Sequence, residues 1–110
     1  MQLPNAQAAM VAPEKLTGYI LNPQHFRGKH KARVFACALG FDLSNHPLLL
    51  AQLLEGARSG SAEIAQTTEH GTIYRVDFNA SGPAGHAGVR SLWLIRPAAG
   101  IPEFVTCYVL

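Results

Sequence analysis

The sequence is poor in charge, in cysteine and in long apolar runs. Charged side chains make up 15% of its 110 residues and the net charge is +2, which excludes a disordered polyelectrolyte and a strongly basic coat protein for nucleic acid. The two cysteines, Cys37 and Cys107, do not suggest a disulfide framework and fit small buried side chains. No apolar run approaches the roughly 18 residues of a membrane span, and the first residues lack the basic region of a signal peptide. We therefore expect a cytoplasmic protein with no membrane partner.

The motifs of several large enzyme classes are absent as well. There is no Walker A, GxGxxG or GxSxG pattern, which argues against nucleotide hydrolysis, dinucleotide binding and α/β-hydrolase chemistry. The histidines are scattered, with no cysteine or carboxylate at zinc-binding spacing: His25, His30, His46, His70 and His86. The sequence therefore predicts no metal site and no cofactor.

The residues that are present suit one small domain. A hydrophobic content of 48% is enough for a single core, and the length leaves no room for a second domain. Residues 1–13 are small and polar and are expected to form a flexible arm, so that the domain proper spans 14–110. The short apolar stretch 16–21 fits either a helix or a strand.

Two helices are predicted in the first half of the chain. Residues 28–39 place apolar side chains at helical spacing and end at a glycine: Ala32, Phe35, Ala36 and Leu39, then Gly40. A second helix is predicted from about 47 to 58, with Ser44 or Asn45 as its cap. Both predicted helices carry one apolar face.

After residue 60 the apolar pattern changes to alternation, which marks a switch from helices to a sheet. Strands are predicted at about 62–69, 72–79, 88–96 and 103–110. The joints between them, His70-Gly71, 81–85 and 97–102, are short and favour antiparallel neighbours. The sequence thus predicts an α+β fold in which two N-terminal helices precede a four-stranded antiparallel β-meander.

A cluster of cations lies where the first predicted helix begins: Arg27, Lys29, His30, Lys31 and Arg33. The helix dipole favours acidic residues at this end, so each cation costs about 0.3–1 kcal/mol there, and holding a phosphate is a function that accounts for the cost. Lys29 and Arg33 lie four residues apart beside one edge of the apolar stripe and are the best placed to act together over the sheet, while Lys31 lies beside the other edge. The alternative is that these charges only solvate the helix.

The last predicted strand carries two hydroxyls on one face. By simple alternation, Thr106 and Tyr108 share a face with Phe104, and the face of Val105 is expected to meet the helices. This places the hydroxyls where they can donate hydrogen bonds to a ligand. The alternative is that Thr106 is an ordinary β-forming residue and Tyr108 a core aromatic.

The preceding predicted strand adds an arginine, a serine and a tryptophan. Arg90 points opposite to Ser91 and Trp93 because side chains alternate along a strand. Only one of these two sets can share a face with Thr106 and Tyr108. Here too the alternative is that Trp93 is a core aromatic.

A longer pattern, spread over residues 15–110, resembles a family of small, functionally uncharacterised bacterial domains found in toxin-like contexts. Its elements are Tyr19-Ile20-Leu21-Asn22-Pro23, His25, Gly28-Lys29-His30-Lys31-Ala32-Arg33-Val34-Phe35, Leu39-Gly40, Gly71, Tyr74, Trp93, Pro102 and Val105-Thr106-Cys107-Tyr108. The helix-then-strand layout of that family in turn looks like the barnase, EndoU, colicin and RelE-type ribonucleases, by analogy of fold. That resemblance implies metal-independent RNA cleavage, with RNA and an antitoxin or immunity protein as partners.

The resemblance also implies roles for individual residues. Attack of a ribose 2′-hydroxyl on the adjacent phosphate needs a base, an acid and cations on the developing charge. The implied catalytic set is His25, His30, Lys29, Thr106 and Tyr108. The implied RNA-binding and phosphate-binding set is Lys31, Arg33, Arg90, Ser91 and Trp93, with Tyr108 or Trp93 stacking a base. The sequence offers no acidic catalytic partner near these positions.

Two other hypotheses stay open at this point. The domain could be a noncatalytic module that binds a protein or nucleic acid, itself the antitoxin of a pair, in which the same cations only dock an acidic surface. It could also be a dimerising module whose last strand pairs with a second copy to form a homodimer.

Overall fold

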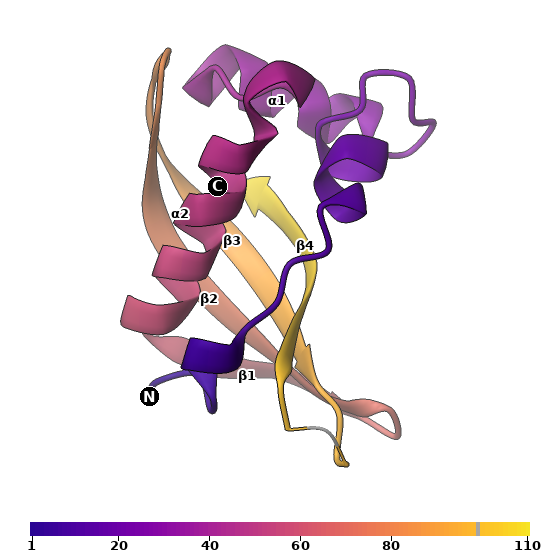
Figure 1. Cartoon of the computed structure of the whole chain (residues 1–110), viewed down its shortest axis with the longest axis vertical. Coiled ribbons are helices and arrows are strands. Elements are labelled where there is room, and N and C mark those ends of the chain that lie inside the picture. Colours follow the sequence, from indigo (N-terminus) through magenta and orange to yellow (C-terminus); the bar gives the residue numbers. More distant parts are fainter. Residues whose placement is uncertain (99) are drawn as a thin grey trace.

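The computed structural model describes residues 1–98 and 100–110 and has an α+β fold (Figure 1). Its helices are α1 (Lys29–Leu39) and α2 (His46–Ser59), together with the short turns η1 (Ala6–Ala8), η2 (Leu16–Ile20) and η3 (Leu43–Asn45). Its strands are β1 (Ala62–Thr68), β2 (Gly71–Gly82), β3 (Gly85–Ile95) and β4 (Pro102–Val109). The helices precede the strands, as predicted, although the short turns make the two-helix description approximate.

The strands form one antiparallel sheet in the order β1-β2-β3-β4, which confirms the predicted meander. β2 and β3 are longer than predicted because they stay paired as far as Gly82 and Gly85, so that only a two-residue turn joins them. Gly82 lets the tip of this hairpin reach α1, since a β-carbon there would collide with the carbonyl oxygen of Leu39. The last predicted joint, 97–102, includes residue 99, which lies outside the described residues.

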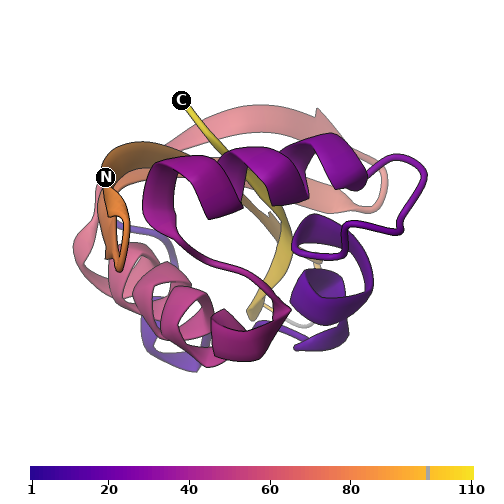
Figure 2. The same cartoon turned by 90° about the horizontal axis from the view of Figure 1, so that it is seen from above.

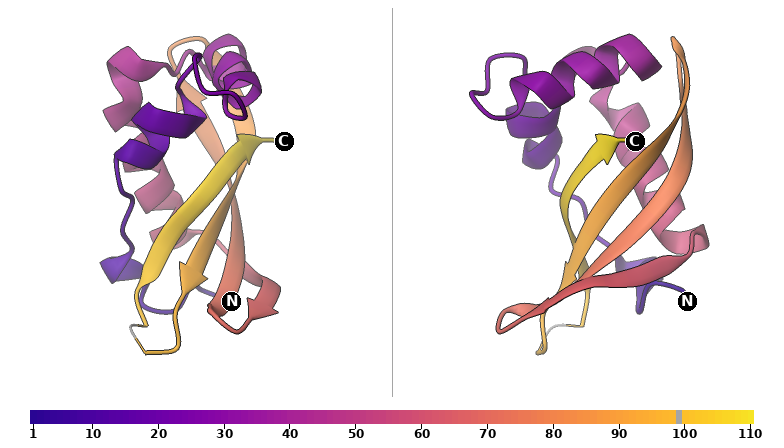
Figure 3. Two further views of the ribbon diagram at one scale, coloured as in Figure 1. Left: turned by 90° about the vertical axis from the view of Figure 1, so that its right-hand side faces the viewer. Right: turned by 180° about the vertical axis from the view of Figure 1, so that it is seen from behind.

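The helices cover one face and one end of the sheet. α2 runs along one face, and α1 lies across the end at which the β2–β3 hairpin turns (Figures 1 and 2). The view from behind shows the other face, on which the described part of the chain places no helix (Figure 3). The largest side chains between the layers are fully buried: Trp93, Phe35, Phe41, Leu49 and Leu53. The end-on position of α1 matters for function, because it brings the cationic cluster to the rim of the sheet.

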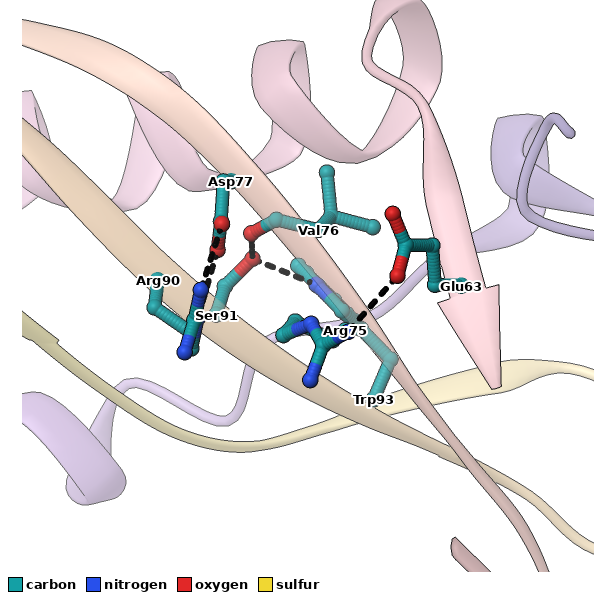
Figure 4. A network of polar contacts seen from close by, with 7 residues as sticks. All are labelled: Glu63, Arg75, Val76, Asp77, Arg90, Ser91 and Trp93. Atoms are coloured by element: carbon teal, nitrogen blue, oxygen red, sulfur yellow. Dashed lines mark hydrogen bonds and ion pairs between the residues drawn. The ribbon is translucent and has the colours of Figure 1, made fainter. Parts of the chain in front are cut away.

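Ser91 and Trp93 belong to this core. Both side chains are 0% exposed. The Ser91 hydroxyl donates to the carbonyl of Val76 at 2.7 Å and accepts from Trp93 Nε1 at 2.9 Å (Figure 4). The pair therefore satisfies its polar atoms internally, as buried polar groups must. This burial contradicts the prediction that Ser91 and Trp93 contact RNA.

A β-bulge in β4 changes which side chains face the core. The register pairs Leu92 with Thr106 but Trp93 with Phe104, so Val105 is the extra residue. Phe104, on one side of the bulge, and Cys107, on the other, therefore both face the helices. Simple alternation placed Phe104 on the face of Thr106, and the bulge makes that prediction wrong.

The first residues of the chain pack against the domain. Leu3 is 2% exposed, Gln2 forms a bridge with Ser61, and Met10 forms a parallel bridge with Glu103 at the edge of β4. The segment predicted as a flexible arm is thus held at both edges of the sheet, and its buried side chains Leu3 and Ala9 add to the core. The stretch that fitted either a helix or a strand is η2, a single π-helical turn.

Within the described residues, no single helix is long and apolar enough to cross a membrane. α1 and the segment Leu43–Ser59 pass that test only as a pair, and they are bent by 67° relative to each other.

Candidate functional site

Lys31 of α1 lies at the centre of the candidate site. Its Nζ donates to Thr106 Oγ1 at 2.8 Å and to the hydroxyl of Tyr19 at 3.4 Å. The same atom lies 5.1 Å from the ring centroid of Tyr19 and 5.8 Å from that of Tyr108. A lysine has three donors, so this ammonium is oriented by two oxygens and two aromatic faces and still has capacity for a ligand.

The surroundings of Lys31 form a small open hollow of about 170 Å³. Its lining comes from α1 and from the end of β4: His30, Lys31, Val34, Tyr108 and Val109. Tyr108 pairs across the sheet with Arg90, so the hollow is bordered by the outer face of the sheet. A cation, a hydroxyl, a phenol and an imidazole thus meet at one place, which is a set suited to binding and polarising a phosphate.

Lys29 and Arg33 lie on the other side of α1. They line a separate groove of about 290 Å³, whose walls include Leu21, Ala32 and Asp42. The helical wheel placed Lys31 on the opposite edge of the apolar stripe from these two, as the structure does. Because α1 crosses the end of the sheet, the edge that meets the hydroxyls of β4 is that of Lys31. The prediction that Lys29 and Arg33 are the cations placed over the sheet is therefore wrong.

In the part of the chain that the structure describes, the arginines on and next to the sheet form ion pairs, whereas the cations around α1 do not. Three arginines of the sheet form ion pairs, with nitrogen–oxygen distances of 2.6, 2.9 and 3.1 Å: Arg75 with Glu63, Arg90 with Asp77 and Arg96 with Glu103. The sequence has no Asp or Glu between Glu14 and Asp42. Among the residues that the structure covers, none of the five Lys and Arg side chains in that interval has a carboxylate partner within 4.0 Å: Lys15, Arg27, Lys29, Lys31 and Arg33. These cations form no ion pairs with the described residues, and although Asp42 lines the groove of Lys29 and Arg33, positive charge exceeds negative charge around α1.

Arg90 is a poorer candidate for phosphate than the sequence indicated. Its guanidinium holds both oxygens of Asp77 at 2.9 Å (Figure 4). Hydrogen bonding to Asp77 raises the pKa of Arg90, and the nearby Tyr108 hydroxyl adds to this shift. Hydrogen bonding from Arg90 likewise lowers the pKa of Asp77 below its ordinary value. A phosphate would have to displace Asp77 to reach the Arg90 guanidinium. Arg90 therefore borders the hollow without binding the phosphate itself.

The two candidate histidines have different surroundings. His25 uses Nδ1 to accept from the backbone N–H groups of Arg27 at 3.0 Å and Gly28 at 2.9 Å, and its ring packs edge-on against Tyr19 with 4.7 Å between centroids. His30 is exposed and lines the hollow, and its Nδ1 lies 3.4 Å from an Arg33 nitrogen. His30 is therefore accessible to a ligand beside Lys31, whereas His25 shapes the turn before α1.

Tyr19 is a site residue that sequence reasoning left without a role. It contacts Lys31 and His25, and a β-carbon at Gly28 would collide with its backbone and ring. The only signal in the sequence was its place in the family pattern, because a contact between η2 and α1 has no periodicity to reveal it. The described residues contain no group of three or more His, Cys, Asp or Glu side chains arranged to hold a metal ion.

The fold and the site together define a small α+β domain with a cluster of cations at one end of an antiparallel sheet. A family model described as domain of unknown function DUF6883 matches residues 2–110, so the chain belongs to that family. No curated protein matches the chain.

Among solved structures, the chain is similar to one from "Contact-dependent growth inhibition toxin - immunity protein complex from Klebsiella pneumoniae 342". The TM-score is 0.67 at 16% sequence identity, and the match covers 91% of this chain and 98% of that one. At this identity the likeness shows a common fold. Neither comparison names a ribonuclease, so the analogy with that superfamily stays a prediction.

Proposed function

We propose that this domain is a toxin-like, metal-independent endoribonuclease that acts in the cytoplasm and is controlled by an immunity or antitoxin partner. The observation that carries the proposal is the 2.8 Å hydrogen bond between Lys31 Nζ and Thr106 Oγ1, because it joins the cationic cluster to the hydroxyl-bearing strand at one hollow. The fold shared with a chain from a toxin–immunity complex supports the toxin or immunity context.

The chemistry follows from the groups in the hollow. The 2′-oxygen of a ribose attacks the adjacent phosphorus while the bond to the 5′-oxygen breaks, which leaves a 2′,3′-cyclic phosphate and a 5′-hydroxyl. His30 takes the proton of the 2′-hydroxyl, and Tyr108 donates a proton to the departing oxygen. Lys31, oriented by Thr106, stabilises the negative charge that grows on the phosphoryl oxygens.

The other cations have a supporting role in this proposal. Lys29 and Arg33 lie across α1 from the hollow and would hold phosphates to one side of the cleaved linkage. Lys29 and Arg33 thus contribute to the affinity for RNA, while Lys31 contributes to the rate of cleavage. This division differs from the sequence-based hypothesis, which placed Lys29 among the catalytic residues.

The test is cleavage of purified bacterial RNA by the full chain in the presence of a metal chelator. We expect fragments with 5′-hydroxyl and 2′,3′-cyclic phosphate ends, and a loss of roughly 100-fold or more in rate for Lys31→Ala. Arg58→Ala removes a cation from α2, away from the hollow, and is expected to cleave like wild type. Intact RNA with the folded wild type, or equal rates for Lys31→Ala and Arg58→Ala, would contradict the proposal.

A second candidate function is noncatalytic docking of an acidic protein. The observation in its favour is the groove beside Lys29 and Arg33, which is mostly apolar and flanked by charge, as protein interfaces often are. It predicts that Lys29→Ala weakens a protein complex and that no RNA is consumed.

A further inference from the structure

The turn before α1 exposes a large aromatic side chain. Phe26 is 82% exposed, more than any other large hydrophobic residue among those the structure describes. Its neighbours in sequence are His25 and Arg27, and Lys29 Nζ lies 5.8 Å from the centroid of its ring. One cation is therefore close to the ring, while most of the ring surface faces solvent.

Hydrogen bonds fix this turn in place. The backbone N–H of Gln24 donates to Asn22 Oδ1 at 2.9 Å, and that of His25 donates to the Asn22 carbonyl at 3.2 Å. The N–H of Lys29 donates to the His25 carbonyl at 3.0 Å, in addition to the two bonds accepted by the His25 ring. The exposure of Phe26 is thus built into an ordered turn, and a ligand that uses the ring has little backbone entropy to overcome.

The charge around Phe26 indicates what such a ligand would be. The ring lies in the stretch between Glu14 and Asp42 that has no acidic residue. Lys29 is close to the ring in space and Arg27 follows it in the sequence, and neither has a carboxylate partner among the described residues. An exposed aromatic ring next to unpaired cations is the combination by which proteins hold single-stranded nucleic acid, with the base on the ring and the phosphates on the cations.

We propose that Phe26 is a stacking platform for a nucleobase of single-stranded RNA, with Arg27 and Lys29 on the adjoining phosphates. This inference rests on the proposed function for the choice of RNA, and it adds a subsite that uses different residues from the hollow. His25, the residue before Phe26, packs on Tyr19, and the Tyr19 hydroxyl accepts from Lys31, so the subsite lies beside the hollow and not in it. The stacked base therefore belongs to a nucleotide outside the cleaved linkage.

Binding can be measured apart from cleavage with a fluorescein-labelled, mixed-sequence oligoribonucleotide that is 2′-O-methylated throughout and so lacks the attacking hydroxyl. Phe26→Ala is expected to weaken its binding to the full chain by roughly 5- to 150-fold, the usual effect of removing one stacking ring. Phe26→Tyr keeps the ring and is expected to bind like wild type. Phe26→Leu keeps apolar volume without a π face and is expected to resemble Phe26→Ala.

Leu48→Ala is the matched control, since Leu48 is a half-exposed side chain of α2 outside the cationic stretch. If Phe26→Ala and Leu48→Ala both bind like wild type, the stacking subsite is wrong, whether or not the wild type cleaves RNA. If Phe26→Leu restores binding, the ring acts by apolar contact, and the nucleobase assignment is wrong. If the wild type itself neither binds this RNA nor cleaves unmodified RNA, the proposed function fails as well.

Discussion

The ammonium of Lys31 and the hydroxyl of Thr106 are hydrogen-bonded at 2.8 Å although 75 residues separate them in the sequence. This bond ties α1, which lies across the end of the sheet, to the edge strand β4. It also fixes the position of the one cation of the cluster that reaches the hydroxyls. A single contact therefore serves both the packing of the helix and the geometry of the candidate site.

The first prediction concerns the energy of that contact. We expect a coupling free energy of about 1 kcal/mol between Lys31→Met and Thr106→Val, because each substitution removes one partner of the same half-buried hydrogen bond. The measurement is urea unfolding of wild type, both single variants and the double variant. Strictly additive changes in the free energy of unfolding would show that the bond does not stabilise the fold.

The unpaired cations lead to a prediction on salt dependence. Binding of the 2′-O-methylated oligoribonucleotide should weaken as salt rises, and Lys29→Ala or Arg33→Ala should each lower the slope of log affinity against log salt by about 0.7. Arg96→Ala should leave the slope unchanged, because that arginine is paired with Glu103 on the sheet. Equal slopes for all the variants would mean that Lys29 and Arg33 do not contact phosphates.

The fold was largely predictable because its elements are local and periodic. The apolar spacing that ends at Leu39 identified α1, the cap and apolar face of residues 47–58 identified α2, and the alternation after Gly60 identified all the strands of the described sheet. The bulge at Val105 was not predictable, since it depends on how β4 pairs with β3 rather than on β4 itself. That one residue decides that Phe104 lies in the core.

The candidate site was predictable only in part. The sequence identified the groups that form the candidate site: Thr106, Tyr108 and the cations of α1. It did not show whether Lys29 or Lys31 meets the hydroxyls, because that depends on how α1 packs on the sheet. Ser91 and Trp93 have the composition of a binding pair, yet they satisfy each other in the core. Hydrogen-bonding capacity is visible in a sequence, whereas the partner that uses it is a tertiary property.

The ion pair between Asp77 and Arg90 leads to a prediction on pH. Hydrogen bonding from Arg90 lowers the pKa of Asp77 from 3.8, so the carboxylate contributes stability above that pH and loses it as the pH falls through the lowered value. The pair is partly exposed, so its contribution should be only about 0.2–1 kcal/mol. Unfolding of wild type and Asp77→Asn should therefore differ near neutral pH and converge in strong acid. A difference that stayed constant down to low pH would contradict this assignment.

The last prediction separates a structural histidine from a catalytic one. An asparagine at position 25 can place its side-chain oxygen near the position of Nδ1 and accept from Arg27 and Gly28, whereas a glutamine mimics the other ring nitrogen. Both substitutions lose the packing of the ring on Tyr19, so we expect His25→Asn to be more stable than His25→Gln by about 1 kcal/mol, the usual effect of losing a cap.

RNA cleavage by the same variants completes the test of the two histidines. His25→Asn should stay close to the wild-type rate, because it keeps the turn that supports Tyr19 and removes no proton-transfer group from the hollow. His30→Asn should lose about 100-fold or more, since it removes the imidazole that lines the hollow beside Lys31. If His25→Asn is folded but loses cleavage to the same extent as His30→Asn, the acid–base role belongs to His25. The two histidines differ in one physical respect: the Nδ1 of His25 accepts from two backbone N–H groups and holds the turn, whereas the ring of His30 is exposed and lines the hollow beside Lys31.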